Sequence, residues 1–147
     1  MNFPVGVAGK GNAGVSALVK ETPGAICYVE YGYALQTGMP MVTLENKSGN
    51  FIKPSLEAGQ AALASVELPA NRRAWIPDPP AANAYPIVSY TWLLCYKKYD
   101  DAKILETLKS IINYGLTDGQ KDSTGLGYIP LPASVIGQDQ KALGEIS

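Results

Sequence analysis

Six residues near the start of the chain, Gly9-Lys10-Gly11-Asn12-Ala13-Gly14, separate an apolar run at residues 3–8 from a stretch with helical periodicity. The apolar run predicts a buried strand, and the glycines predict a tight turn. Asn12 belongs to the residue types that cap helices, so we expect it to be the N-cap of the helix that follows. The local order is therefore strand, tight turn and helix.

The next hundred residues alternate between helical and strand patterns. Thr22-Pro23-Gly24 should end the first helix, because proline disfavours helix before it and glycine tolerates the turn. Residues 25–33 are rich in aromatic and β-branched side chains and predict a second strand, continued by a short helical turn. Residues 41–44 and 49–52 flank a turn sequence and predict a hairpin. Pro54-Ser55 then opens a further helix.

Residues 67–84 form a proline-dense stretch that predicts a connection over the surface and a boundary between two structural regions. Residues 86–96 give the strongest strand pattern in the chain. Asp100 is expected to cap the clearest helix, and a shorter helix should close the chain. Strands that alternate with helices indicate an α/β fold, with mixed sheets and flanking helices. The apolar stripes of the last two helices comprise Ile104, Leu105, Leu108, Ile111 and Ile112, and then Val135, Ile136 and Leu143.

The composition excludes several classes of function. The 147 residues correspond to one domain or one contiguous piece of a larger protein. A formal charge of −1 argues against a nucleic-acid interface, and zero histidines exclude Ser-His-Asp and Cys-His catalysis. Cys27 and Cys95 lie far apart in apolar runs, which predicts unpaired core thiols and no zinc site. The composition therefore predicts neither histidine-dependent catalysis nor a metal site, and the further expectation of a protein that is not an enzyme and holds no cofactor rests on the resemblance described below.

No apolar run approaches the length of about 18 residues that a membrane helix needs. The first residues also lack the basic and apolar regions of a signal peptide. We expect a soluble chain without an export signal of its own.

The glycine turn allows two interpretations. Gly9, Gly11 and Gly14 match the spacing of the dinucleotide-binding fingerprint, and Glu30 stands about 20 residues later, where an acid would bind a ribose hydroxyl. This alternative predicts a small dinucleotide-dependent oxidoreductase domain. The predicted helix is short for that fold, however, and small residues also let a turn pack tightly. Lys10 is followed by Gly11 rather than Ser or Thr, so a phosphate-cradling Walker loop is excluded.

Arg72 and Arg73 lie in the proline-dense stretch, where we expect a solvated surface pair. Composition and spacing thus give an α/β domain with one turn that could face an anion. They predict no group of side chains that could act together in catalysis.

Longer motifs add a resemblance. Phe3-Pro-Val-Gly-Val-Ala-Gly-Lys-Gly-Asn-Ala-Gly-Val, continuing to Thr22-Pro-Gly-Ala-Ile-Cys-Tyr-Val-Glu-Tyr-Gly-Tyr-Ala34, closely resembles the periplasmic phosphate-binding protein of bacterial phosphate ABC transporters. Tyr85-Pro-Ile-Val-Ser-Tyr-Thr-Trp-Leu-Leu and Leu131-Pro-Ala-Ser-Val-Ile resemble later segments of that family. Cys27 departs from the pattern, since the family usually has glycine there. The resemblance runs in order along nearly the whole chain.

The resemblance implies the C-terminal half of a two-lobed clamp, a partial periplasmic-binding-protein (type II) fold. Residues 1–66 would be the C-terminal part of the second lobe, 67–84 the crossover and 85–147 the C-terminal part of the first lobe. The expected parent is the periplasmic substrate-binding component of a phosphate importer. Its implied partners are inorganic phosphate, the N-terminal half and an ABC permease, with no nucleic acid.

The family's phosphate-gripping motifs are absent from this sequence, so the resemblance assigns no phosphate ligand to any residue here. Gly9, Lys10, Gly11 and Asn12 remain as expected anion contacts at the edge of the cleft. We expect the chain alone to bind phosphate weakly or not at all. We also expect it to associate, as a homo-oligomer among other forms, because strands would be left unpaired.

Overall fold

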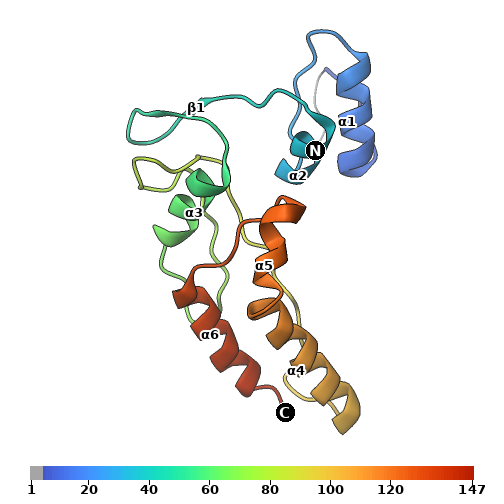
Figure 1. Cartoon of the computed structure of the whole chain (residues 1–147), viewed down its shortest axis with the longest axis vertical. Coiled ribbons are helices and arrows are strands. Elements are labelled where there is room, and N and C mark those ends of the chain that lie inside the picture. Colours follow the sequence, from blue (N-terminus) through green and yellow to red (C-terminus); the bar gives the residue numbers. More distant parts are fainter. Residues whose placement is uncertain (1–4) are drawn as a thin grey trace.

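The computed structural model describes residues 5–147 and shows an open arrangement of helices joined by long extended segments (Figure 1). Residues 3 and 4 of the first predicted strand lie outside the described part. Residues 6–9 have no regular secondary structure, so the predicted strand is not formed there. None of the helices in residues 5–147 combines the length and apolarity needed to cross a membrane.

The first two helices pack against each other at one end of the molecule. Helix α1 (Gly11–Glu21) ends at Thr22, as its Pro-Gly sequence predicts, and Gly24 adopts a φ of 80°. Helix α2 (Tyr31–Thr37) begins within the last three residues of the predicted strand and includes the short helical turn that was expected after it. The preceding residues 25–30 are extended but belong to no sheet. The strand prediction for residues 25–33 is therefore wrong, because the chain turns into a helix capped by Glu30.

The sheet within the described residues is a single hairpin. Strand β1 (Leu44–Glu45) pairs antiparallel with β2 (Phe51–Ile52), with Leu44 opposite Ile52. This confirms the hairpin predicted from the turn sequence. Helix α3 (Leu56–Ala64) follows, and its N-cap Ser55 accepts a hydrogen bond of 3.1 Å from the backbone N–H of Ala58.

Residues 86–96 differ most from their prediction. They are extended, yet their only ladder contact within the described chain is an isolated bridge between Pro77 and Ile87. A strand is defined by its partners, and here the neighbouring strands are missing. The structure thus combines helices with a small sheet and is α/β-like, and the larger mixed sheet that the sequence predicted is not formed within residues 5–147.

The C-terminal third is helical. Helix α4 (Ala102–Leu116) packs against α6 (Ala133–Gly144), with α5 (Gln120–Ser123) and the short 3-10 helix η1 (Thr124–Leu126) between them. Asp101, not Asp100, caps α4 by accepting hydrogen bonds from the N–H groups of Lys103 and Ile104.

A small core lies between α3 and the proline-dense stretch. Leu63, Ala74 and Ile76 form its buried centre, and Val88 and Tyr90 pack against it among other apolar residues. The stretch predicted to run over the surface therefore supplies core residues, because Ala74 and Ile76 alternate with exposed neighbours and point inward. No large side chain in the described residues is fully buried.

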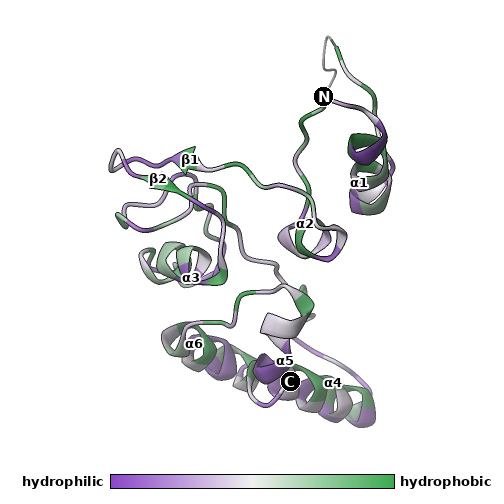
Figure 2. Cartoon of the chain, turned by 45° about the horizontal axis from the view of Figure 1, so that its top comes forward, coloured by the Kyte–Doolittle hydropathy of each residue, from purple (hydrophilic) through white to green (hydrophobic). Residues whose placement is uncertain are grey.

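The molecule exposes far more surface than a compact protein of its size. Its accessible surface is 10556 Å², whereas a compact monomer of 15.6 kDa exposes about 7,200 Å². Figure 2 shows hydrophobic residues along extended stretches, for example in the segment leading into α2. Cys27 and Cys95 are free, as predicted, but exposed, which contradicts their predicted place in a core.

Candidate functional site

The turn before α1 is built by the close approach of its own backbone. A Cβ on Gly9 would lie 2.6 Å from the backbone nitrogen of Val15, which is too close for any side chain. Gly11 adopts a φ of 64°, a conformation that favours glycine. The geometry therefore supports the interpretation that these glycines let the turn pack tightly.

The N-terminus of α1 carries no side-chain cap. Its N-cap residue is Lys10, which makes no capping hydrogen bond, so the prediction that Asn12 caps the helix is wrong. Asn12 lies inside the first turn, where its Oδ1 accepts a hydrogen bond of 3.2 Å from the backbone N–H of Glu30. The amide of Asn12 therefore ties the glycine turn to the segment that enters α2.

Lys10, Gly11 and Asn12 are exposed and Gly9 is half-buried. Lys10 forms no ion pair with any residue in the described part of the chain. Backbone N–H groups at a helix N-terminus carry a partial positive charge and attract anions. The four predicted residues thus lie together at the uncapped N-terminus of α1. Among them, Lys10 supplies a positive charge that is not paired with any acid in the described residues.

The elements of a dinucleotide site are not assembled around this turn. No strand precedes it within residues 5–9, and the Oε1 of Glu30 accepts a hydrogen bond of 2.9 Å from the N–H of Gly32 as the N-cap of α2. The acid that the alternative assigned to a ribose hydroxyl is therefore used inside the protein. Nothing in this geometry favours the oxidoreductase alternative.

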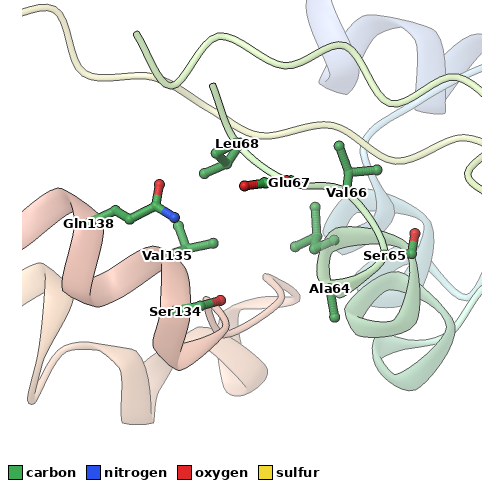
Figure 3. A pocket seen from close by; sticks show the side chains of 9 residues that line it. Ala64, Ser65, Val66, Glu67, Leu68, Ser134, Val135 and Gln138 are labelled. Atoms are coloured by element: carbon green, nitrogen blue, oxygen red, sulfur yellow. The ribbon is translucent and has the colours of Figure 1, made fainter. Parts of the chain in front are cut away.

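Two shallow hollows lie away from the turn. The first, of about 330 Å³, lies between the end of α3 and α6 and is lined mainly by small and apolar side chains (Figure 3). Glu67 is its charged lining residue, which disfavours an anion. The second, of about 350 Å³, includes Arg72, Lys141 and Glu145 in its lining. Neither hollow contains a residue of the predicted site.

Arg72 is a structural residue, and its predicted place at the solvated surface is wrong. Its backbone φ is 58°, which is unusual for a residue with a side chain. Its Nε lies 3.3 Å from Oδ1 of Asp139, and its Nη2 donates a hydrogen bond of 3.1 Å to the carbonyl of Gln138. The indole N–H of Trp92 donates to the carbonyl of Arg72 at 2.8 Å. Arg72 therefore joins the proline-dense stretch to α6.

The surroundings of Asp139 raise the pKa of its carboxyl group. Burial raises it, and the positive charge of Arg72 opposes that change. Burial also raises the pKa of Tyr90, with a further contribution from the negative charge of Asp139. No group of three or more His, Cys, Asp or Glu side chains that could hold a metal ion occurs in residues 5–147.

No protein-family model matches the chain. The chain is 38% identical to the phosphate-binding protein PstS of Methanocaldococcus jannaschii, over 91% of its own length and 38% of that protein. It is 33% identical to PstS of Xylella fastidiosa strain 9a5c, over 94% of the chain and 38% of the relative. For PstS of Pasteurella multocida the identity is 31%, over 92% of the chain and 40% of the relative.

The chain spans about two fifths of the length of the curated relatives that it matches. The resemblance predicted from the glycine turn and the later motifs is confirmed over about nine tenths of the chain. In sequence, this chain is related to a segment of the PstS phosphate-binding proteins.

Proposed function

We propose that the chain is the C-terminal part of a phosphate-binding protein, the substrate-binding component of a phosphate ABC importer. The observation that carries the proposal is the similarity to proteins named phosphate-binding, at 31–38% identity over at least 91% of this chain in three organisms. The chain is then a binding module rather than an enzyme. Its parent would work in the periplasm with an ABC permease and would carry a periplasmic-binding-protein (type II) fold.

In this proposal, residues 1–66 belong to the second lobe and residues 85–147 to the first, with residues 67–84 crossing between them. The absence of helices and named strands from residues 67–84 supports a connecting role for that stretch. The N-terminal half of the parent would supply the rest of both lobes.

Gly9, Lys10, Gly11 and Asn12 would contact the anion at the edge of the cleft. An uncapped helix N-terminus, the exposed Lys10 and a tight turn that requires glycine support this placement. The Asn12 Oδ1 is occupied by the Glu30 N–H, so Asn12 would act through its backbone N–H or its Nδ2 group.

These contacts alone are too weak for tight binding. An exposed helix terminus contributes about 0.3–1 kcal/mol to the binding of a charge, whereas a micromolar dissociation constant needs about 8 kcal/mol. Each hydrogen bond to phosphate must also replace one to water. The remaining donors would have to come from the part of the parent that this chain does not match.

The test uses a chimera. In it, this chain is fused in one polypeptide to the part of the M. jannaschii protein that it does not match. Isothermal titration with inorganic phosphate should show tight binding by the chimera and little heat with the chain alone. Lys10→Ala should weaken binding by the chimera, and Lys20→Ala, at the other end of α1, should not. Micromolar binding by the chain alone would contradict the proposal, as would nicotinamide-cofactor binding that is lost in Glu30→Ala.

A further inference from the structure

Helices α1 and α2 form a small unit that no hydrogen bond joins to the C-terminal helices. Within the described chain, the hydrogen bonds of residues 5–37 reach no residue beyond Met39. Residues 38–43 link the unit to β1, and Figure 1 shows α2 directly above the segment that contains α5. The position of the unit relative to the C-terminal helices therefore depends on packing.

This packing brings two buried glycines together. A Cβ on Gly127, the C-cap of η1, would lie 2.7 Å from the Cα of Gly32 in the first turn of α2. From the other side, a Cβ on Gly32 would lie 3.1 Å from the carbonyl oxygen of Leu126. Backbone atoms cannot rotate out of the way, so a side chain at residue 127 has to push α2 aside.

The Gly127 side of the contact is held in place. The N–H of Gly127 donates to the carbonyl of Thr124 at 3.1 Å. Two residues later, Ile129 packs on the small core, and its side chain occupies the space that a Cβ on Gly59 of α3 would need. The backbone at Gly127 is thus anchored to η1 and, through Ile129, to the core.

The Gly32 side of the contact leads to the expected anion contacts. The N–H of Gly32 donates to Oε1 of Glu30 at 2.9 Å, and the N–H of Glu30 donates to Oδ1 of Asn12 at 3.2 Å. Asn12 lies in the glycine turn, where its carbonyl accepts a hydrogen bond of 2.7 Å from the hydroxyl of Ser16. Because these bonds follow one another, a displacement of Gly32 disturbs the turn itself.

We propose that Gly127 is a positioning residue for the phosphate contacts at residues 9–12, acting through Gly32 and Glu30. The proposal rests on the proposed function for the identity of the anion. Groups from different parts of a fold bind one ligand together only when their geometry is held to within about 0.5 Å. Since carbon atoms pack at about 3.5–4.0 Å, a Cβ 2.7 Å from Gly32 has to displace α2 by more than this tolerance.

Amide hydrogen exchange in the full chain tests the contact without phosphate. Gly127→Ala should speed exchange of the Glu30 and Gly32 N–H groups by about tenfold or more, and exchange within α6 should stay the same. Gly49→Ala is the matched control. Its φ of 78° is close to the 82° of Gly127, and apart from its neighbours in the chain a Cβ there would meet no atom nearer than 4.0 Å. The two variants thus share the backbone strain, and only Gly127→Ala meets α2.

Gly32→Ala tests the same contact from the side of α2, and it decides the matter if Gly127→Ala fails to fold. Alanine suits a helix, so the effect of this variant comes from its approach to Leu126 and Glu30. The expected increase in exchange at Glu30 is smaller, about threefold. Unchanged exchange at Glu30 in the folded variants would overturn the proposal.

The chimera tests positioning for phosphate by a double-mutant cycle. Gly127→Ala should weaken phosphate binding by about fivefold or more, and Gly49→Ala by less than about twofold. Lys10→Ala should weaken binding in the native chimera but have little further effect beside Gly127→Ala, because the turn is already displaced. Full additivity of the two changes would overturn the positioning role, since Gly127 would then act independently of the turn.

The two experiments separate this proposal from the proposed function. A native chimera that binds no phosphate would contradict the proposed function. In that case, faster exchange at Glu30 and Gly32 in Gly127→Ala would still support the role of Gly127 in placing the turn, and unchanged exchange would overturn it.

Discussion

Asn46 makes the densest set of side-chain hydrogen bonds around the hairpin. It is 4% exposed, its Nδ2 donates to the carbonyls of Ala82 and Ala84, and its Oδ1 accepts from the N–H groups of Ser48 and Asn50. One amide thus holds the turn and ties it to the proline-dense stretch. The sequence marks a turn here, but it gives no signal that this residue reaches a segment more than thirty positions away.

Asn46→Ala should leave two carbonyls and two N–H groups without these partners, at a cost of about 2–3 kcal/mol. The N–H groups of Ser48 and Asn50 should then exchange with solvent at least about tenfold faster. Asn83→Ala is the control, because Asn83 is exposed in the same stretch and has no side-chain hydrogen bond among the described residues. Unchanged exchange in Asn46→Ala would show that the buried amide does not hold the turn.

Gly9→Ala should disrupt the turn before α1, because the added Cβ meets backbone atoms of Gly14 and Val15 that cannot rotate away. The expected penalty is about 1–3 kcal/mol. NMR should show loss of the hydrogen bonds from Gly14 N–H to Lys10 and from Glu30 N–H to Asn12. Gly137→Ala, in open space on α6, should instead favour its helix by about 0.5–1 kcal/mol. A Gly9→Ala variant with both hydrogen bonds intact would contradict this account of the turn.

Among the elements, helix starts and stops could be predicted from short motifs, because a cap or a Pro-Gly stop acts within one turn of the chain. Thr22, Ser55 and the hairpin turn are examples. Motifs separate neighbouring cap candidates less well, since Lys10 rather than Asn12 is the N-cap of α1 and Asp101 rather than Asp100 is the N-cap of α4. Strands were overpredicted, because residues 25–30 and 86–96 have strand composition while the ladder depends on partners elsewhere. The candidate anion contacts were found from the glycine motif, whereas Arg72 and Asp139 meet only in the fold.

Asp101→Ala should weaken the start of α4 by about 1 kcal/mol, because two N–H groups lose their acceptor. Amide exchange at Lys103 and Ile104 should rise about fivefold. Asp100→Ala should leave exchange at these sites nearly unchanged, since Asp100 does not cap the helix. Equal effects from the two variants would contradict the assignment of the cap.

The free energy of unfolding should depend on pH through the partly buried carboxyl group of Asp139 on α6. Because burial raises the pKa of this carboxyl above 3.8 in the folded chain, the protonated form is favoured there. The contribution of protonated Asp139 to the free energy of unfolding is therefore fully present below pH 3.8. It is lost as the pH rises through the pKa of Asp139 in the folded chain. An NMR titration should show the raised pKa, and Arg72→Ala should raise it further by removing the opposing positive charge. Arg73→Ala serves as the control, and a lower pKa in Arg72→Ala would refute this account.

At the scale of the whole molecule, the buried apolar residues are mostly small, and the extended segments carry their large apolar side chains outward. A chain of this length could bury about 68–70% of its unfolded surface. The 10556 Å² that remains accessible shows that this arrangement falls well short of that compaction. The sequence supplies apolar runs suited to the centre of a sheet, but the covering strands are not formed within the described residues. We therefore regard the chain as one part of a larger folded unit.

Static light scattering over a concentration series, combined with a calorimetric melt of the same samples, tests whether the chain is part of a larger folded unit. The expected result is a mass that rises with concentration and a broad melt without a single cooperative transition, because the uncovered strand edges associate. Addition of the unmatched part of the M. jannaschii protein should replace both with a discrete complex and one sharp transition. A strictly monomeric chain that melts cooperatively by itself at high concentration would contradict the account.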